Sequence, residues 1–316
     1  MNLLIYTYID YIIYIYSNIE FNKMSTNHKK IKIAISQVAP LIGLDHYNNF
    51  PKIVCELWRK YDRQTFNNLE KEYQNKNVDI ATDSDARRMV RNDKKHGTNI
   101  YQQVKHINKK RKLSTDITTE QNVVINQIKN NLSIKEEEKQ KIIKSVTSST
   151  NKMHGVKNED SVLEMFQKST GMKLVNGQGW INYPISNTSN IEWSITGKYD
   201  GLTECNTIVE AKKRQKKLFK SLRDYENIQI QCYMLGLGLD KACLVESYSN
   251  SKGTECNIIN VDFDKVYASN VIMERLKKFC DFFEEFINNT KWQEEMVLGD
   301  VNRNLYNLYC KDYLML

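Results

Sequence analysis

The helical spacing of apolar residues is clearest in the second half of the chain. Apolar positions three and four residues apart predict a helix over 158–170, which begins with Asn158 as N-cap and ends at Gly171. The same spacing predicts later helices, at about 221–236 and from about 266 onward.

Between and after these helices, runs with strand periodicity lie at 179–186, 191–201, 207–212, 241–248 and 255–262. The resulting order is helix, strands, helix, strands, helix. It predicts an α/β (α+β) fold in which helices flank a central mixed β-sheet.

The first half of the chain has a different pattern. Residues 31–58 are apolar, with a turn signal at Gly43 and Asp45, whereas residues 60–150 are rich in Asn, Lys, Gln and Glu. The latter segment is predicted to be a polar, mostly helical insertion with mobile joins. The predicted divisions are an N-terminal extension at 1–23, a first part of the core domain at 24–59, the insertion at 60–150 and the remaining core with C-terminal helices at 151–316.

Composition narrows the class of partner. The 316 residues carry a formal net charge of +8, which favours an anionic partner, with nucleic acid ahead of a membrane surface. The apolar run within residues 1–23 is short and interrupted by Asp10, so we expect no stable membrane association and treat Met24 as the functional start, with a membrane anchor as the alternative. The seven cysteines include no CxxC pair, which argues against a disulfide framework or zinc site and favours an intracellular protein.

Charged residues interrupt the strand pattern in ITGKYDGLTECNTIVEAKKRQ, residues 195–215. If this stretch is a hairpin centred near Cys205, Asp200 and Glu210 lie directly opposite one another, with Cβ atoms about 5 Å apart. Two like charges in that position repel, and a divalent cation such as Mg²⁺ would remove the repulsion.

Lys212 follows Glu210 by two residues, so strand alternation places both on one face. An ammonium group there can orient a metal-bound water and stabilise charge that develops on a phosphoryl group. A surface hairpin with a salt bridge would also account for Glu210 and Lys212, but not for an Asp200 that faces Glu210.

Glu159 shares the apolar face of its predicted helix, because Val162, Leu163 and Phe166 follow it at helical spacing. A carboxylate on a buried face needs a partner, and a metal site is one. An interaction of this first-turn residue with the helix dipole is the alternative.

The helix predicted over 221–236 carries polar side chains as well. Gln229 and Tyr233 share a face, whereas Gln231 points about 200° away from Gln229, so at most one of the two glutamines points directly into a common site. Basic residues crowd the segment before this helix: Lys213, Arg214, Lys216, Lys217, Lys220 and Arg223. They form a candidate phosphate-binding patch, with a solvated basic face as the alternative.

With these residues assembled, the chain resembles the PD-(D/E)XK nuclease superfamily and, within it, the phage-lambda-type (YqaJ-like) recombination exonucleases. The resemblance is carried by ISQVAPLIGLDHY at 35–47, by HGVKNEDSVLEMFQKSTG at 154–171, and by ITGKYDG, IVEAK and QIQCYM in order along the chain. It implies a restriction-endonuclease-like core, with residues 60–150 as an insertion into it.

The resemblance also implies roles for individual residues. Asp200, Glu210 and the backbone carbonyl of Ala211 would bind metal, Lys212 would act on the water, and Glu159 would be a further ligand or orient that water. Gln229 or Gln231 would position the nucleophile or DNA, and Ser36 and Tyr233 would contact DNA. Two Mg²⁺ ions are implied, with Mn²⁺ as a substitute, and a water would attack with inversion at phosphorus.

These observations favour a Mg²⁺-dependent deoxyribonuclease, specifically a 5′→3′ exonuclease that acts on duplex DNA ends in viral or phage-like recombination or replication. A single-strand annealing protein is the implied partner, and for a viral protein the compartment is the nucleus or cytoplasm of the infected cell. A structure-specific or restriction-like endonuclease on the same core is the first alternative. A nucleic-acid-binding protein with an inactive nuclease core is the second.

Overall fold

The computed structural model describes residues 29–45, 50–72, 90, 96–109, 113–187, 191–298 and 302–315. The predicted N-terminal extension and Met24 lie outside this part of the chain. Among the described residues, none of the helices has both the length and the apolar character that a membrane span requires.

A three-stranded sheet carries the first set of strands. Its order is β1-β4-β3, formed by β1 (Lys29–Ala34), β4 (Ile191–Tyr199) and β3 (Gly179–Asn187). β1 is parallel to β4, and β3 is antiparallel to it, so this sheet is mixed.

A five-stranded sheet carries the other set. Its order is β2-β5-β6-β7-β8, formed by β2 (Leu174–Asn176), β5 (Gly201–Thr203), β6 (Thr207–Lys213), β7 (Lys241–Asn250) and β8 (Gly253–Asp262). Within it β6 and β7 run parallel, and α9 (Asp224–Leu237) provides the crossover connection that a parallel pair requires. The other neighbouring pairs are antiparallel.

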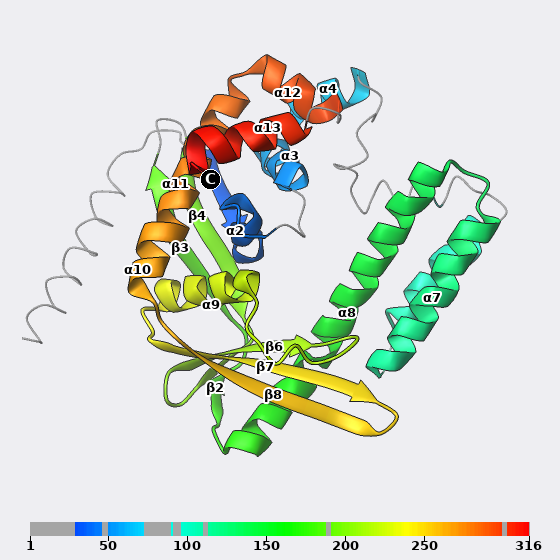
Figure 1. The fold of residues 1–316 in the computed structure, drawn as a ribbon, viewed down its shortest axis with the longest axis vertical. Coiled ribbons are helices and arrows are strands. Elements are labelled where there is room, and N and C mark those ends of the chain that lie inside the picture. Colours follow the sequence, from blue (N-terminus) through cyan, green and yellow to red (C-terminus); the bar gives the residue numbers. More distant parts are fainter. Residues whose placement is uncertain are drawn as a thin grey trace, which may run out of the picture.

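Helices cover both sheets (Figure 1). Besides α9, they are α2 (Ile35–Leu41), α3 (Phe50–Tyr61), α4 (Arg63–Glu72), α6 (Gly97–Ile107), α7 (Ser114–Asn131), α8 (Glu136–Thr170), α10 (Lys265–Tyr267), α11 (Glu274–Ile287), α12 (Thr290–Leu298) and α13 (Asn302–Leu308). The π-helical turn η1 (Ala268–Met273) precedes α11, and the π-helical turn η2 (Tyr309–Leu314) follows α13.

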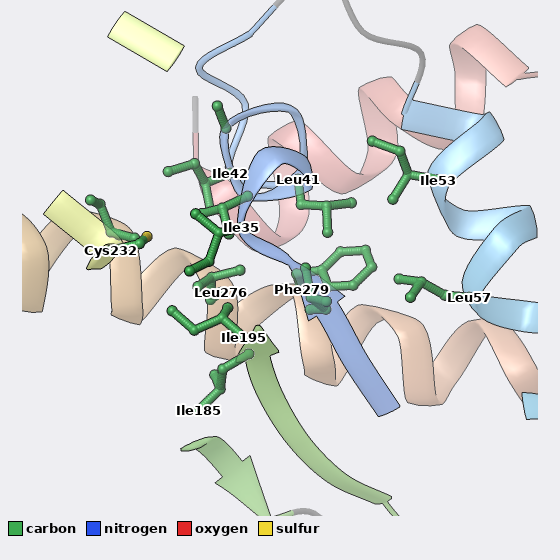
Figure 2. Close-up of a cluster of buried hydrophobic side chains, with 14 of the residues drawn as sticks. Ile35, Leu41, Ile42, Ile53, Leu57, Ile185, Ile195, Cys232, Leu276 and Phe279 are labelled. Carbon is green, nitrogen blue, oxygen red and sulfur yellow. The ribbon is translucent and has the colours of Figure 1, made fainter. Parts of the chain in front are cut away.

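The main core lies between the three-stranded sheet and α2, α3, α9 and α11 (Figure 2). The sequence FCDFFEEF repeats aromatic residues at helical spacing, so α11 buries one continuous aromatic face against the sheet. Phe279 is fully buried and lies within ring-packing distance of Phe50, Trp193 and Tyr309. Edge-to-face contacts of this kind orient the helix as well as burying area.

A second apolar cluster joins the helices of the predicted insertion. Ile100 of α6, Ile117, Val124 and Ile128 of α7, and Ile142 of α8 are buried together. α7 lies beside the first half of α8, and α6 packs on both helices (Figure 1). The polar composition of residues 60–150 therefore hides a narrow stripe of isoleucine and valine that holds these helices to one another.

The α/β class with mixed sheets and flanking helices is confirmed, and the observed strands overlap all five runs expected from periodicity. Instead of one central sheet, the strands form two sheets. The predicted division at residue 150 lies inside α8, which continues without a break to Thr170. Asn158 is therefore not an N-cap; it is buried within the helix and donates to the carbonyl of His154 at 2.8 Å.

The end of the insertion nearest the N-terminus also differs from the prediction. Phe66 of α4 is buried in the main core, where its ring meets Trp58 edge-to-face. α4 therefore packs with the core domain, although its sequence is mostly polar.

Replacement of Phe279 by Ala should lower the free energy of unfolding by about 3–5 kcal/mol, because it leaves a cavity inside the aromatic cluster. Urea denaturation measures this loss. The matched truncation Val266→Ala, at a side chain that is exposed, should change the free energy by less than about 0.5 kcal/mol. Equal stability of both variants would contradict the core assignment.

Candidate active site

The chain crosses from one sheet to the other at a single residue. β4 ends at Tyr199 and β5 begins at Gly201, so Asp200 occupies the junction. β5 and β6 pair with Gly201 opposite Val209 and Leu202 opposite Ile208. This register centres the hairpin at Cys205, as predicted.

The same register brings Asp200 opposite Glu210, and both side chains are buried. The Oδ2 atom of Asp200 accepts a hydrogen bond from the backbone N–H of Ala211 at 2.8 Å. The N–H and C=O of one strand residue point to the same edge, so the Ala211 carbonyl also faces the Asp200 side of β6. The backbone group that the resemblance implies as a ligand therefore lies on the required side.

Strand alternation divides the side chains of β6 as expected. Val209 and Ala211 are buried against the Val162, Leu163 and Phe166 face of α8. Glu210 and Lys212 lie on the opposite face, toward α9, where Lys212 Nζ donates to Glu210 Oε1 at 2.7 Å.

Gln229 of α9 completes this side of the site. Its Nε2 donates to Glu210 Oε1 at 2.9 Å, and its Oε1 accepts from Lys212 Nζ at 3.4 Å. One oxygen of Glu210 is thus fully engaged. The other oxygen, Oε2, is buried and has no hydrogen-bond partner among the described residues.

Glu159 approaches Asp200 from α8. Its Oε2 accepts a hydrogen bond from Gln178 Nε2 at 2.7 Å, and Gln178 in turn accepts one from Lys198. Glu159 is half-buried, and its charge acts on the carboxyl group of Asp200. The helical face predicted for Glu159 is therefore observed, and it brings a third carboxyl group to the junction.

Burial and mutual repulsion raise the pKa values of these acids. Burial and then the charge of Glu159 raise the pKa of Asp200 to about 6. Burial raises the pKa of Glu210 to about 7, although Lys212 opposes this effect. For Lys212, burial acts to lower the pKa, but the charge and hydrogen bond of Glu210 outweigh burial and raise it.

These features fit a hard cation. Within the described residues no three His, Cys, Asp or Glu side chains converge as a ready-made metal centre. However, Mg²⁺ is commonly held by one or two carboxylates and keeps several waters. The unpartnered Oε2 of Glu210 and the neighbouring Asp200 carboxylate provide such a pair, because a cation would satisfy the first atom and reduce the repulsion between the two side chains.

Two residues of α9 that were predicted to act in the site, Gln231 and Tyr233, make structural hydrogen bonds instead. Gln231 is buried away from the carboxylates: its Nε2 donates to the carbonyl of Asp262 at 3.0 Å, and its Oε1 accepts from Asp264 N at 2.9 Å. Tyr233 is also buried; its hydroxyl accepts from Gln229 and donates to the carbonyl of Lys198. Gln231 therefore joins α9 to the end of β8, and Tyr233 supports Gln229 instead of presenting a surface to DNA.

The predicted basic patch separates into buried and exposed members. Arg214 is buried and forms ion pairs with Glu226 and Glu246, each at 2.7 Å. Lys213 is half-buried and donates to Ser247 and Ser249 of β7. These two side chains are engaged within the fold, which leaves the other four members of the patch as the candidates for contact with DNA. The exposed members are Lys216, Lys217, Lys220 and Arg223.

Ser36 is exposed in the first turn of α2, which packs against α9. It therefore lies on an element next to the helix that carries Gln229. Its contact with DNA stays a prediction.

Glu246 is the organising residue that the sequence reasoning missed. It is fully buried in β7, and its carboxylate accepts hydrogen bonds from Arg214 and from the backbone N–H groups of Phe219 and Lys220. Burial acts to raise the pKa of Glu246, but these donors outweigh it and lower the pKa. Glu246 thereby fixes the loop between Lys212 and α9. A charged residue inside the apolar run at 241–248 was the available signal.

No family model matches the chain, and no curated protein matches it. Among solved structures, an alkaline exonuclease (LHK-Exo) from Laribacter hongkongensis is similar, with 14% sequence identity and a TM-score of 0.34, over 53% of this chain and 90% of that chain. The structure of LHK-Exo in complex with dAMP has 12% identity and a TM-score of 0.33, over 53% and 90% of the two chains. Both TM-scores are too low to support an inference about activity, so the function has to be inferred from the site itself.

The raised carboxyl pKa values should make the metal-free protein lose stability as pH rises. A folded-state pKa of about 7 for Glu210 means that the native state holds a proton which the unfolded chain has already released. The stabilisation is complete below about pH 4 and is lost by about pH 8. Between about pH 4 and pH 8, the free energy of unfolding in EDTA should therefore fall by about 1–3 kcal/mol less for Glu210→Gln than for the wild type. Urea denaturation at several pH values in this range measures the difference.

The control for this experiment is Glu274→Gln, which removes the same charge from an exposed ion pair on α11. That variant should follow the pH dependence of the wild type. A Glu210→Gln variant with the wild-type slope would contradict the assigned environment of Glu210.

Replacement of Glu246 by Gln should destabilise the fold by about 3–5 kcal/mol, because it removes one partner from a buried ion pair. It should also release the loop that this carboxylate holds. Limited trypsin digestion should then cut faster after the exposed Lys216, Lys217 and Lys220. Glu274→Gln, at the exposed pair with Lys277, should cost at most about 1 kcal/mol and leave the digestion rate unchanged.

Proposed function

We propose that this protein is a Mg²⁺-dependent deoxyribonuclease that hydrolyses phosphodiester bonds at the junction between its two sheets. The observation that carries the proposal is the buried Asp200–Glu210 pair with Lys212 hydrogen-bonded to Glu210 at 2.7 Å. Such a pair is costly for stability unless it serves a charged ligand. A lysine on the same strand face adds a cation where charge would develop on a phosphoryl group.

Asp200, Glu210 and the Ala211 carbonyl would hold Mg²⁺, with Mn²⁺ able to replace it; we propose two ions. When bound, Mg²⁺ would polarise the phosphoryl oxygens and lower the pKa of a coordinated water. The protein's own part is to hold Lys212 next to the proposed metal ligand Glu210, where Gln229 also contacts its ammonium group. Glu159, whose pKa is raised by burial and by Glu210, could accept or share a proton next to Asp200.

DNA is the proposed substrate because the exposed basic residues lie close to the carboxylates along the chain. Lys216, Lys217, Lys220 and Arg223 occupy the loop that starts just after Lys212 and leads into α9. Arg223 stacks over the ring of Phe219 at 4.5 Å, which holds its charge near the surface of the loop. Such a platform neutralises phosphates without reading sequence.

The finer proposal is a 5′→3′ exonuclease that acts on duplex ends during viral or phage-like recombination or replication. Its support is the resemblance of the ordered motifs to recombination exonucleases. A single-strand annealing protein is the partner that this role would require, and the nucleus or cytoplasm of an infected cell is the matching location. An endonuclease on the same core would use the same carboxylates and lysine.

The other class of function, a DNA-binding protein with an inactive core, has less support. An inactive core would have no need to keep a buried, unpartnered oxygen on Glu210 next to Asp200. The activity experiment separates the two classes.

Asp200→Ala and Lys212→Ala should each reduce the rate of DNA cleavage at least about 100-fold in Mg²⁺, because the first removes a proposed ligand of the metal and the second removes the cation that would stabilise charge on the phosphoryl group. DNA affinity, measured by fluorescence anisotropy in EDTA, should change by less than about threefold. The exposed Lys277→Ala variant on α11 serves as the control and should cleave at the wild-type rate. Equal cleavage by all of these proteins would refute the site assignment.

Linear and covalently closed circular duplexes distinguish an exonuclease from an endonuclease. The wild type should release nucleotides from the linear form and leave the closed circle intact, since an exonuclease needs an end. Gel electrophoresis of both substrates after the same incubation measures this. Nicked or linearised circles would favour the endonuclease.

A further inference from the structure

Trp180 is the most exposed tryptophan of the described chain. It is 73% exposed on β3, at the edge of the three-stranded sheet. By contrast, Trp58 and Trp193 are buried in the main core, and Trp292 is half-buried against Phe282. Such a high solvent exposure is unusual for tryptophan, whose side chain is mostly buried in folded proteins, and it suggests a binding role.

Hydrogen bonds connect the residue that pairs with Trp180 to Glu159 at the candidate active site. Trp180 pairs across the sheet with Lys198, so the two side chains share one face. Lys198 donates to Gln178, which donates to Glu159 at 2.7 Å. The indole therefore stands at the rim of the candidate active site, beside an exposed lysine.

The backbone pairing places the start of β3 beside the end of β4 that leads to Asp200. Gly179 pairs with Tyr199, and a Cβ on Gly179 would lie 2.1 Å from the Tyr199 hydroxyl, so only glycine permits this close approach. Tyr199 directly precedes Asp200. Lys198 and Asp200 are two residues apart, about 7 Å along an extended strand.

We infer that Trp180 stacks on an unpaired nucleobase of the strand whose phosphate lies at Asp200 and Glu210, and that Lys198 contacts a phosphate next to that base. This inference rests on the proposed nuclease function and narrows its substrate to DNA ends that carry an unpaired nucleotide. Base faces inside a duplex are covered by their neighbours, so an indole beside the path of the phosphates can reach a base face only where the nucleotide is unpaired. The lysine supplies the complementary charge for the phosphate that follows each base.

The surroundings of Trp180 favour a nucleotide over a docked protein. The nearest residues on its face of β3 and β4, Asn182, Thr196 and Lys198, are polar or charged. Protein interfaces need a continuous apolar patch, whereas one aromatic ring among polar and basic groups is the usual arrangement for stacking a base.

The test is the affinity for two DNA probes in EDTA, a blunt duplex and the same duplex with a short unpaired thymidine overhang, measured by anisotropy. Trp180→Ala should weaken binding of the overhang probe about 5- to 150-fold and should affect the blunt probe much less. Trp180→Phe should retain most of the affinity, because the phenyl ring still stacks. Trp292→Phe, at a distant tryptophan on α12, should bind both probes like the wild type.

A second readout locates the contact. Overhang DNA should quench the tryptophan emission of the wild type and of Trp292→Phe, and this quenching should disappear in Trp180→Phe. Wild-type affinity for the overhang probe in Trp180→Ala, with quenching retained in Trp180→Phe, would overturn the stacking site even if the wild type cleaves DNA. A wild type that neither binds nor cleaves either probe would instead overturn the nuclease proposal itself, together with the stacking site that depends on it.

Discussion

The structure depends on one unfavourable contact, the meeting of buried carboxyl groups where the chain passes from one sheet to the other. Asp200 and Glu210 face each other across a short hairpin, and Glu159 adds a third acid from α8. Burial and repulsion raise the pKa values of these acids. The hydrogen bonds from Lys212, Gln229 and the Ala211 backbone offset only part of the cost of burying the carboxylates. Glu210 Oε2, which has no hydrogen-bond partner among the described residues, remains uncompensated.

Much of the surrounding architecture keeps this contact in place. The apolar face of α8 packs under Val209 and Ala211, which orients the other face of β6 toward α9. α9 supplies Gln229, and Tyr233 braces Gln229 by a hydrogen bond of 2.8 Å. Glu246 secures the loop that joins β6 to α9. The same arrangement leaves Lys212 held between Glu210 and Gln229, beside the acids and close to the basic loop.

Local pattern was sufficient to predict much of the fold and the centre of the candidate site. The hairpin about Cys205 and the shared face of Glu210 and Lys212 follow from strand periodicity alone, because turn position and alternation fix them. The helix face of Glu159 follows from the spacing of three apolar residues. These features depend on near neighbours in the sequence, which a pattern can describe.

The sequence-based predictions that differ from the structure concern contacts between residues far apart in the chain. No periodicity indicates that Arg214, one member of a basic run, turns inward to meet Glu226 and Glu246, because those partners come from α9 and β7. Likewise, the burial of Gln231 against Asp262 and Asp264 depends on where β8 ends in space. The division into two sheets arises because the chain bends at Asp200, within a run that reads as one continuous strand.

The most direct test of the account is calorimetric titration of Mg²⁺ into the metal-free protein at about pH 6.5, between the pKa values of about 6 and about 7 for Asp200 and Glu210. Metal binding should expel protons from these carboxyl groups, so the measured heat should change with the ionisation enthalpy of the buffer. Glu210→Gln should bind Mg²⁺ at least about tenfold more weakly and release fewer protons. Absence of Mg²⁺ binding in the wild type, or equal binding and proton release in Glu210→Gln, would contradict a cation site between the two carboxylates.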